Sequence, residues 1–293
     1  MARDPLTRGG IATAPGAPRR VRRQGANGAL ITGSVLFGLV VCGGLFASLL
    51  SSWGPRAADD VNTLVPPGTA GHLLGTDRFG YDVLSRVLHA VRLDLLVGVS
   101  AVVVAVVVGS LIGAAVGYLG GWADEVGMRV VDILQAFPAF VLALAVAAVL
   151  GGGPVALVLV LALVNVAPYI RLMRSEVRAV RSATYVEAAR CAGNGTLRLL
   201  LRHIVPNCLR PVFVLAPLNC GWAVITLAGL SFLGLGVEVT EAEWGAMINT
   251  GAGDALSGDW WPVVFPGAAL FVTVLALALI SEGLQSATRV RRS

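Results

Sequence analysis

The sequence predicts an all-α membrane protein that crosses the bilayer six times. Of its 293 residues, 56% are hydrophobic and 13% are charged, and the mean hydropathy is +0.79. Soluble globular domains carry about 25% charged residues, so this composition indicates an integral membrane protein. Its apolar runs have the length of spanning helices and lack the short alternation of barrel strands, which makes the expected class all-α.

The N-terminal part is predicted to be a tail followed by one retained helix. Residues 1–28 hold six arginines with several Pro and Gly, a composition typical of a disordered cytoplasmic tail. The next run, 29–50, is 22 residues long and no clear cleavage site follows it. Because a signal peptide has an apolar core of about 7–15 residues, the run is expected to remain as the first transmembrane helix.

Five further apolar runs are each predicted to span the membrane. They are 95–119, 133–150, 155–170, 211–236 and 262–281. All but 155–170, which has 16 residues, reach the length expected of a spanning helix.

Residues 51–94, between the first two spans, are expected to be an extracytoplasmic segment ending in a lead-in helix. Asp82 can cap this helix, which would direct Val83, Val87 and Ala90 towards the membrane. The second outer segment, 237–261, carries five acidic residues and no basic one. It is expected to be a solvated loop, with a surface for a basic partner as the alternative.

The distribution of arginine predicts the orientation. With the N-terminus inside, the inner segments hold 18 arginines and the outer segments hold 4. Since cytoplasmic segments are enriched in basic residues, both termini are expected to be cytoplasmic. Trp244, Trp260 and Trp261 are expected in the aromatic belt at the membrane interface.

Several kinds of chemistry are disfavoured by what the chain contains. All 22 basic residues are arginine, so the phosphate-binding loop that requires a lysine is excluded. The four cysteines and three histidines lack metal-ligand spacing. No ionisable residue lies in the middle of a predicted span and no internal repeat is evident, which disfavours a self-contained secondary transporter. Asn165 and Asn219 lie within spans, where they either line a translocation path or form hydrogen bonds between helices.

A polar, arginine-rich loop, 171–210, separates the fourth and fifth spans. Residues 185–192 favour a helix, and a Gly-Asn-Gly sequence then interrupts it. Thr196 is expected to cap a second helix over 197–203, which Pro206 is expected to end. Two short helices joined by a glycine turn predict a compact structure and not a flexible loop. A loop that touches only anionic lipid is the alternative to a loop with a functional role.

This loop resembles the EAA loop of permeases in ABC importers. The match consists of Glu187-Ala188-Ala189, Gly193 six residues after the glutamate, and Ile204-Val205-Pro206 ending nineteen residues after it. The ending His203-Ile204-Val205-Pro206-Asn207 is similar to that of the dipeptide/oligopeptide/nickel permeases. The resemblance implies that the loop couples this chain to a separate ATP-binding subunit. The coupling positions would be Glu187, Ala188, Ala189, Gly193, Ile204 and Pro206.

Two other stretches resemble the same family. Residues 72–86 are similar to the segment before the second span of the C-type subunit, with Tyr81 where arginine is more usual. Residues 230–236, followed by Trp244-Gly245, resemble the end of the fifth span. The last span departs from the family, because Ser281-Glu282 stands where Gly-Asp is common and Gln285 where arginine is common.

The resemblance covers about residues 70–285 and implies a permease core over 95–285, followed by a cytoplasmic tail over 286–293. It implies a multi-pass protein of the bacterial plasma (inner) membrane that pairs with a B-type permease, two ATP-binding subunits and an extracellular solute-binding protein. This chain would then be no enzyme and hold no cofactor, since ATP and Mg would bind to the partner ATPases. Peptides are the expected cargo. A nickel-chelate importer, a secondary transporter and a membrane scaffold or receptor remain alternatives.

Overall fold

The computed structural model describes residues 19–69 and 71–292, and the secondary structure within them is mainly helical, apart from the segment 51–82. The β-structure of this described part consists of three isolated bridges, so the predicted all-α class is confirmed. Five helices are long and apolar enough to cross a membrane, and one bent pair makes a sixth span when it is counted as one.

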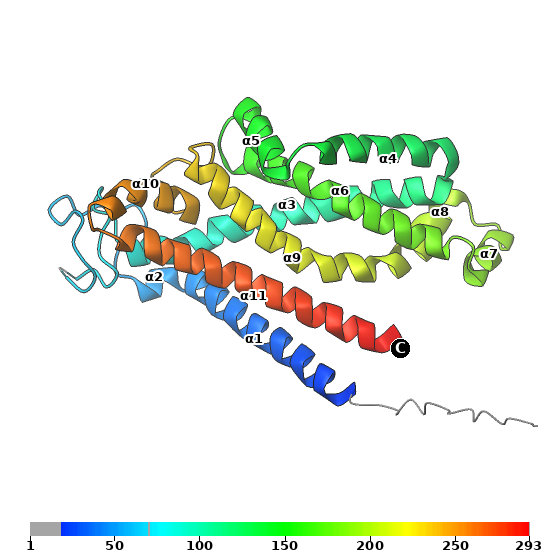
Figure 1. The fold of residues 1–293 in the computed structure, drawn as a ribbon, viewed down its shortest axis with the longest axis horizontal. Coiled ribbons are helices and arrows are strands. Elements are labelled where there is room, and N and C mark those ends of the chain that lie inside the picture. The colour runs from blue at the N-terminus through cyan, green and yellow to red at the C-terminus, as the bar shows by residue number, and fades with distance from the viewer. Residues whose placement is uncertain (1–18, 70, 293) are drawn as a thin grey trace, which may run out of the picture.

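The long helices run along the long axis of the molecule (Figure 1). They are α1 (Arg19–Leu45), α3 (Val83–Leu119), α6 (Pro154–Val180), α9 (Val205–Phe232) and α11 (Trp261–Arg292). α3 packs along α6, and α1 packs along α11. The start of α1 and the end of α11 both point towards the end of the molecule that carries α7 (Thr184–Cys191) and α8 (Thr196–Leu199) (Figure 1). The opposite end carries α2 (Ala47–Leu50) and α10 (Trp244–Leu256).

The first helix starts earlier than expected. Residues 1–18 of the predicted tail lie outside the described residues, whereas residues 19–28 belong to α1. The last proline of the tail is Pro18, so no proline interrupts a helix that begins after it. α1 then approaches α11 closely at Gly33, where a Cβ atom would lie 2.8 Å from the Ala276 carbonyl oxygen. Small residues allow membrane helices to pack in this way.

The predicted third span is not one straight helix. The run 133–150 is divided between α4 (Gly121–Ala136) and α5 (Ala139–Leu150), which meet at 88°. The cause is Pro138, because a proline disfavours the helical conformation of the residue before it. Phe137 accordingly has an extended backbone, with φ −89° and ψ 140°. The bend opens space between this pair and α6.

The lead-in helix is confirmed and is longer than expected. The Asp82 carboxylate accepts a hydrogen bond from the Ser85 N–H at 2.7 Å, and α3 begins at the next residue, Val83. Val83, Val87 and Ala90 are all buried. α3 continues without a break for 37 residues, so the lead-in helix and the second span are a single element.

Polar contacts order the segment that precedes α3. His72 is buried, its Nδ1 atom lies 2.9 Å from Asp82 Oδ1, and its ring stacks on Trp53 with centroids 4.5 Å apart. Tyr81, at the position where the family more often has arginine, lies under the Arg86 guanidinium at 4.6 Å. This face-on contact is the geometry of a cation–π interaction.

The segment 237–261 was expected to be a solvated loop, and this expectation is wrong over α10. The Glu243 carboxylate caps α10 by accepting from the N–H groups of Gly245 and Ala246 at 2.8 and 2.7 Å. The helix buries the face that carries Trp244 and Met247 against α3 and α11. A stretch with a clear capping residue therefore became a helix, although its acidic composition suggested solvent exposure.

The aromatic-belt prediction is wrong for two of its three tryptophans. Trp244 is fully buried and its Nε1–H donates to the Val87 carbonyl at 3.1 Å. Trp261 is 6% exposed and its Nε1–H donates to the Thr76 carbonyl at 2.9 Å. The Trp244 indole thus joins α10 to α3, and the Trp261 indole joins α11 to the segment that precedes α3. Of the three tryptophans, only Trp260 is substantially exposed, at 48%.

Candidate functional site

The arginine-rich loop is shorter than its composition suggested. Residues 171–180 continue α6 for almost three turns. Arg174 and Arg178 form ion pairs with Asp124 of α4, and Arg171 pairs with Asp132 of α4 at 2.6 Å. These carboxylates neutralise much of the charge that suggested an exposed loop. The segment that remains between α6 and α9 contains α7, α8 and the π-helical turn η1 (Leu200–Ile204).

α7 is anchored to the protein on one face and exposed on the other. Val186 is fully buried in a cluster with Leu199 and Ile204, and Ala189 packs against the same cluster. Arg190 donates a hydrogen bond to the Tyr118 hydroxyl at the end of α3, at 3.2 Å. The helix is therefore fixed to the core and does not hang as a free loop.

The glycine turn after α7 is confirmed, and its geometry explains the residue. Gly193 has φ +80°, a conformation that side-chain-bearing residues rarely adopt. The Gly193 N–H donates to the Arg190 carbonyl at 3.0 Å, and the Asn194 N–H donates to the Ala189 carbonyl at 3.3 Å. These two bonds form the Schellman motif that closes a helix C-terminus. The Asn194 side-chain amide adds a third bond to the same Ala189 carbonyl, at 2.9 Å.

The expected boundaries of the second short helix are wrong at both ends. Thr196 makes no side-chain cap, because it is the first residue of α8 and Gly195 occupies the cap position. Pro206 does not end the helix; it lies in the first turn of α9. The π turn makes this possible. The Val205 N–H donates to the Leu200 carbonyl five residues earlier, which widens the turn that a proline ring would otherwise clash with.

The six predicted coupling positions divide into exposed and buried groups. Glu187, Ala188, Gly193 and Pro206 are exposed, Ala189 is half-buried and Ile204 is fully buried. Within the described residues the Glu187 carboxylate makes no ion pair or side-chain hydrogen bond, and it lies in the first turn of α7, where the helix dipole favours negative charge.

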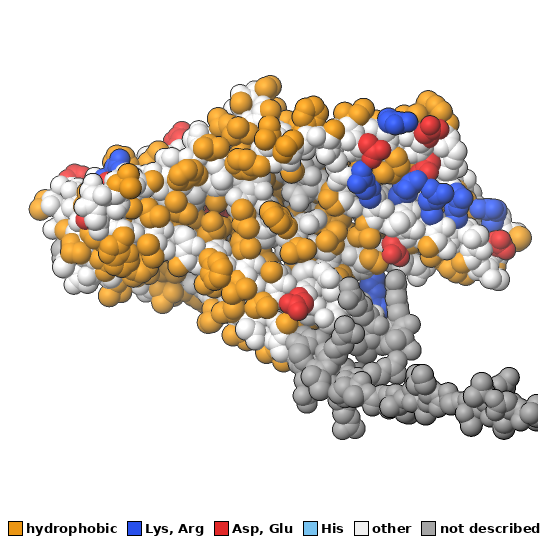
Figure 2. Space-filling view, viewed as in Figure 1, with side chains coloured by type: hydrophobic (Ala, Val, Ile, Leu, Met, Phe, Trp, Pro, Cys, Tyr) orange, Lys and Arg blue, Asp and Glu red, His pale blue; other side chains and the backbone are white. Residues whose placement is uncertain are grey.

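Sequence reasoning did not single out the apolar residues of this surface. Tyr185, Leu197 and Leu201 are 42%, 69% and 46% exposed beside α7 and α8. Partial burial raises the pKa of the Tyr185 phenol. The sequence pattern that could have indicated this surface is the run of leucines over 197–201, interspersed with Arg198 and followed by Arg202, two exposed arginines. Figure 2 shows basic side chains gathered at this end of the molecule, while hydrophobic side chains cover much of the long helices.

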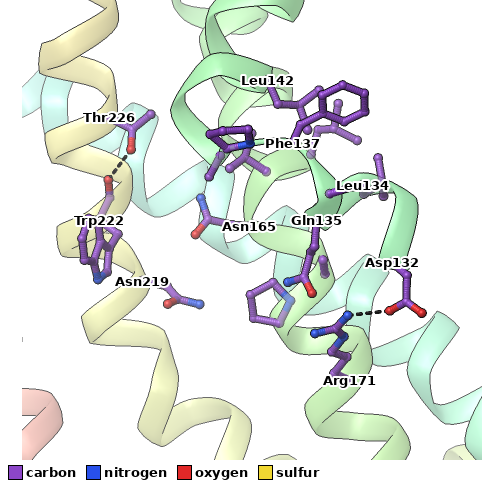
Figure 3. A pocket seen from close by; sticks show the side chains of 17 residues that line it. Asp132, Leu134, Gln135, Phe137, Leu142, Asn165, Arg171, Asn219, Trp222 and Thr226 are labelled. Atoms are coloured by element: carbon purple, nitrogen blue, oxygen red, sulfur yellow. Dashed lines mark hydrogen bonds and ion pairs between the residues drawn. The ribbon is translucent and has the colours of Figure 1, made fainter. Parts of the chain in front are cut away.

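A pocket of about 740 Å³ lies where α4 and α5 bend away from α6 and α9. Asn165 and Asn219, predicted separately, both line it, and Figure 3 shows the Asn219 amide pointing into it from α9. Asn165 donates to the Leu161 carbonyl at 2.8 Å. The Asn219 amide lies near the Tyr169 hydroxyl, yet its buried Nδ2 atom completes no hydrogen bond of normal geometry within the described chain.

The lining of this pocket is mixed in character. Gln135 and Thr226 add neutral polar groups, Trp222 adds an aromatic face, and the Arg171–Asp132 pair lies at one side (Figure 3). Each side-chain amide offers both a donor and an acceptor, which is the hydrogen-bonding character of a peptide bond. The arrangement therefore suits a neutral or zwitterionic polar ligand better than a purely apolar one.

The model of one family, described as binding-protein-dependent transport system inner membrane component, matches residues 99–291. The di/tripeptide transport system permease protein DppC of Pseudomonas aeruginosa (strain UCBPP-PA14) is 39% identical over 261 residues, 87% of this chain and 86% of its own. The probable D,D-dipeptide transport system permease protein DdpC of Escherichia coli (strain K12) is 38% identical, covering 87% and 85% of the two chains. The glutathione transport system permease protein GsiD of Pectobacterium atrosepticum is 36% identical, covering 85% and 86%.

Proposed function

Because the chain belongs to the family of binding-protein-dependent transport system inner membrane components, we propose that it is the permease subunit of an ATP-driven importer of short peptides. The observation that carries this proposal is the exposed surface formed by α7 and α8 at one end of a bundle of membrane-length helices. The surface is held by the core, so force applied there reaches the long helices.

The α7–α8 surface is the docking site for a separate ATP-binding subunit. Ala188 is small and exposed, which permits close approach of a partner backbone. Leu197 and Leu201 offer apolar contact, and Glu187, which has no ion-pair partner among the described residues, offers a negative charge for a basic partner group. Gly193 and Ile204 act indirectly: the first shapes the turn, and the second fixes the surface to α9 through the core.

The remaining subunits follow from this arrangement. A second permease of the B-type completes the translocation pathway, two ATP-binding subunits hold ATP and Mg, and a solute-binding protein delivers the cargo to the end that carries α2 and α10. This chain itself performs no hydrolysis. Both termini are cytoplasmic, which the arginine distribution supports, as does the direction of α1 and α11 towards the α7–α8 end.

The pocket containing Asn165 and Asn219 is a section of the translocation pathway. Short peptides are favoured over nickel chelates for two reasons. Its amide-rich lining matches peptide bonds, and the three relatives named above are described by di- or tripeptides, D,D-dipeptides and glutathione. ATP-driven movement of the α7–α8 surface would rock α9 and α6 as packed units and change access to this pocket.

The docking role is tested in the assembled complex with a matched pair of substitutions at the exposed Ala188. Ala188→Trp should abolish substrate-stimulated ATP hydrolysis and uptake, because the indole prevents close approach, whereas Ala188→Ser should retain both. Co-purification of the ATP-binding subunits reports assembly directly. Normal coupling in the tryptophan variant would reject the docking site.

The pathway role and the secondary-transporter alternative need separate measurements. Asn219→Leu should reduce peptide uptake while leaving basal ATP hydrolysis and thermal stability near wild type. If the variant instead loses stability or assembly, Asn219 serves to hold the helices together by hydrogen bonding. Uptake by this chain alone in vesicles, driven by an ion gradient without the partner subunits, would overturn the importer assignment.

A further inference from the structure

Two adjoining cavities share Arg92 of α3 and lie away from the pocket and the α7–α8 surface: one lies between α1 and α3, and the other between α3 and the segments at 55–56 and 241–242. The larger is an apolar groove of about 390 Å³ whose lining includes Val41, Leu45, Leu95, Leu96 and Val99. The smaller, of about 220 Å³, has charged and polar side chains in its lining, among them Arg56, His89 and Glu241. Arg92 belongs to both linings and marks the boundary between them.

The order of these groups along α3 follows from helix geometry. His89, Arg92, Leu96 and Val99 are spaced by three or four residues, so they lie on one face. With a rise of 1.5 Å per residue, the face from His89 to Val99 extends about 15 Å. It begins with polar residues near the start of α3 and becomes apolar deeper in the helix. The two cavities therefore form one amphipathic site.

Among the described residues, Arg92 is held by backbone carbonyl oxygens and by no carboxylate. Its Nε atom donates to the Gly44 carbonyl at 2.9 Å and its Nη2 atom donates to the Leu45 carbonyl at 3.0 Å, at the C-terminal end of α1. These bonds orient the guanidinium through Nε and Nη2. Within residues 19–69 and 71–292, Arg92 forms no ion pair with a carboxylate. Arg56, which lines the smaller cavity, is paired with Glu241.

We propose that this site binds a membrane phospholipid, with the phosphate on Arg92 and one acyl chain in the groove. Charge complementarity supports this occupant, because an oriented guanidinium without an acidic partner binds a phosphate well. The groove opens where Leu96 and Val99 are 66% and 42% exposed on a helix of membrane length, so an acyl chain can enter from the bilayer. His89 and Arg56 provide additional polar contacts for the head group.

The bound lipid would join α1 to the rest of the protein. α1 contacts mainly α11, with a smaller contact to α3, and it precedes the family-matched region 99–291. A phospholipid in the groove would touch both α1 and α3, and its phosphate would bind the arginine that caps the end of α1. Its loss would therefore loosen α1 first. The proposal concerns lipid binding and does not depend on which solute is transported.

Native mass spectrometry of the purified permease complex tests the site, with dioleoyl phosphatidylethanolamine as the probe. Dioleoylglycerol serves as a matched lipid without phosphate, and inorganic phosphate serves as the head group alone. The wild-type complex should retain the phospholipid and bind each comparison probe at least about tenfold more weakly, as expected when a charge-assisted contact or the apolar contact is missing.

Four variants separate the two parts of the site. Arg92→Gln should weaken phospholipid retention about tenfold or more. Arg92→Lys should recover part of the retention, because lysine restores the charge but lacks the planar guanidinium with its several N–H donors. Leu96→Trp fills the groove and leaves Arg92 in place, so it should weaken retention even if the Arg92 variants fold poorly. Leu111→Trp, an exposed leucine farther along α3, is the matched control and should bind as wild type. Equal retention in wild type, Arg92→Gln and Leu96→Trp would overturn the proposal, as would equal binding of dioleoylglycerol.

Discussion

Replacing Gly193 by alanine should loosen the docking surface by a calculable amount. A Cβ atom at Gly193 would meet nothing within 4 Å, so steric collision contributes nothing. The cost arises from the backbone, because φ is +80° and an alanine in the left-handed region costs about 1 kcal/mol. This corresponds to an approximately fivefold increase in local opening.

Gly195 provides the matched control. It lies two residues away, its φ is −65°, and a Cβ atom there would also meet nothing within 4 Å. Gly195→Ala should therefore leave the turn unchanged, although both substitutions add the same methyl group to the same exposed loop.

Hydrogen exchange of the α7–α8 peptide reads this difference directly. The amides of residues 193 and 194 donate to Arg190 and Ala189, so in Gly193→Ala they should exchange about fivefold faster than in wild type. Substrate-stimulated ATP hydrolysis of the assembled complex should fall in the same variant only. Equal exchange in the Gly193→Ala and Gly195→Ala proteins would refute the reasoning from backbone conformation.

Three further predictions concern packing and protonation. Burial raises the pKa of Glu243, whose carboxyl lies beside that of Asp94, so the folded protein holds the proton more tightly than the unfolded chain. This contribution to stability is complete below the pKa of the glutamate in the unfolded chain, about 4.3, and is lost as pH rises through the raised pKa of the folded state. The Tm of wild type should therefore fall with increasing pH relative to the Tm of Glu243→Gln. Parallel curves of Tm against pH for the two proteins would contradict it. Ile204→Ala should lower the free energy of unfolding, measured by denaturation, by about 2–5 kcal/mol. Leu197→Ala, at an exposed site, should change it by less than about 0.5 kcal/mol. The Leu197 variant should still weaken ATPase coupling, measured by ATP hydrolysis. Trp244→Phe removes the indole bond to the Val87 carbonyl and should cost about 1–3 kcal/mol in thermal unfolding, with Trp260→Phe as the exposed control showing little change.

Local rules were sufficient where one residue decides the conformation. Asp82 was recognised as a helix cap and Gly193 as a break, because a side-chain acceptor and a positive φ each act within a few residues. The apolar runs also located the membrane-length helices, because their length alone is informative.

The effects of the prolines could not be read in the same way. Pro138 bends its span by 88°, whereas Pro206 is absorbed by a π turn in a helix that continues. The difference lies in the surroundings. Leu200 and Ile204, the first and last residues of the π turn, are packed in one cluster, so a continuous helix is stabilised there. Among the described residues, the buried clusters that hold α4 and α5 are separate ones. Packing of this kind depends on residues far away in the sequence.

The sequence was sufficient to identify single residues of the candidate site, but not to predict how the fold brings them together. The Glu-Ala-Ala sequence indicated α7, but only the fold shows that Ala189 faces inward and Ala188 faces outward. Asn165 and Asn219 were each noticed as polar residues in apolar spans. Their meeting in one pocket depends on how α6 crosses α9 and on the bend at Pro138, and neither is encoded locally. Trp244 was misjudged for the same reason, because hydropathy does not distinguish lipid from protein interior.

The continuity of α8, η1 and α9 has a mechanical consequence. Together they form one helical element over Thr196–Phe232, 37 residues, and at 1.5 Å per residue its length is about 55 Å. Such an element acts as a lever arm: if its loop end is the pivot, a tilt of about 5° moves the other end by about 5 Å, the scale of one helical turn. Asn219 lies partway along this arm, so the pocket would receive a fraction of the displacement and the α10 end would receive most of it. A small rotation at the loop end would thus produce a larger displacement farther along the element.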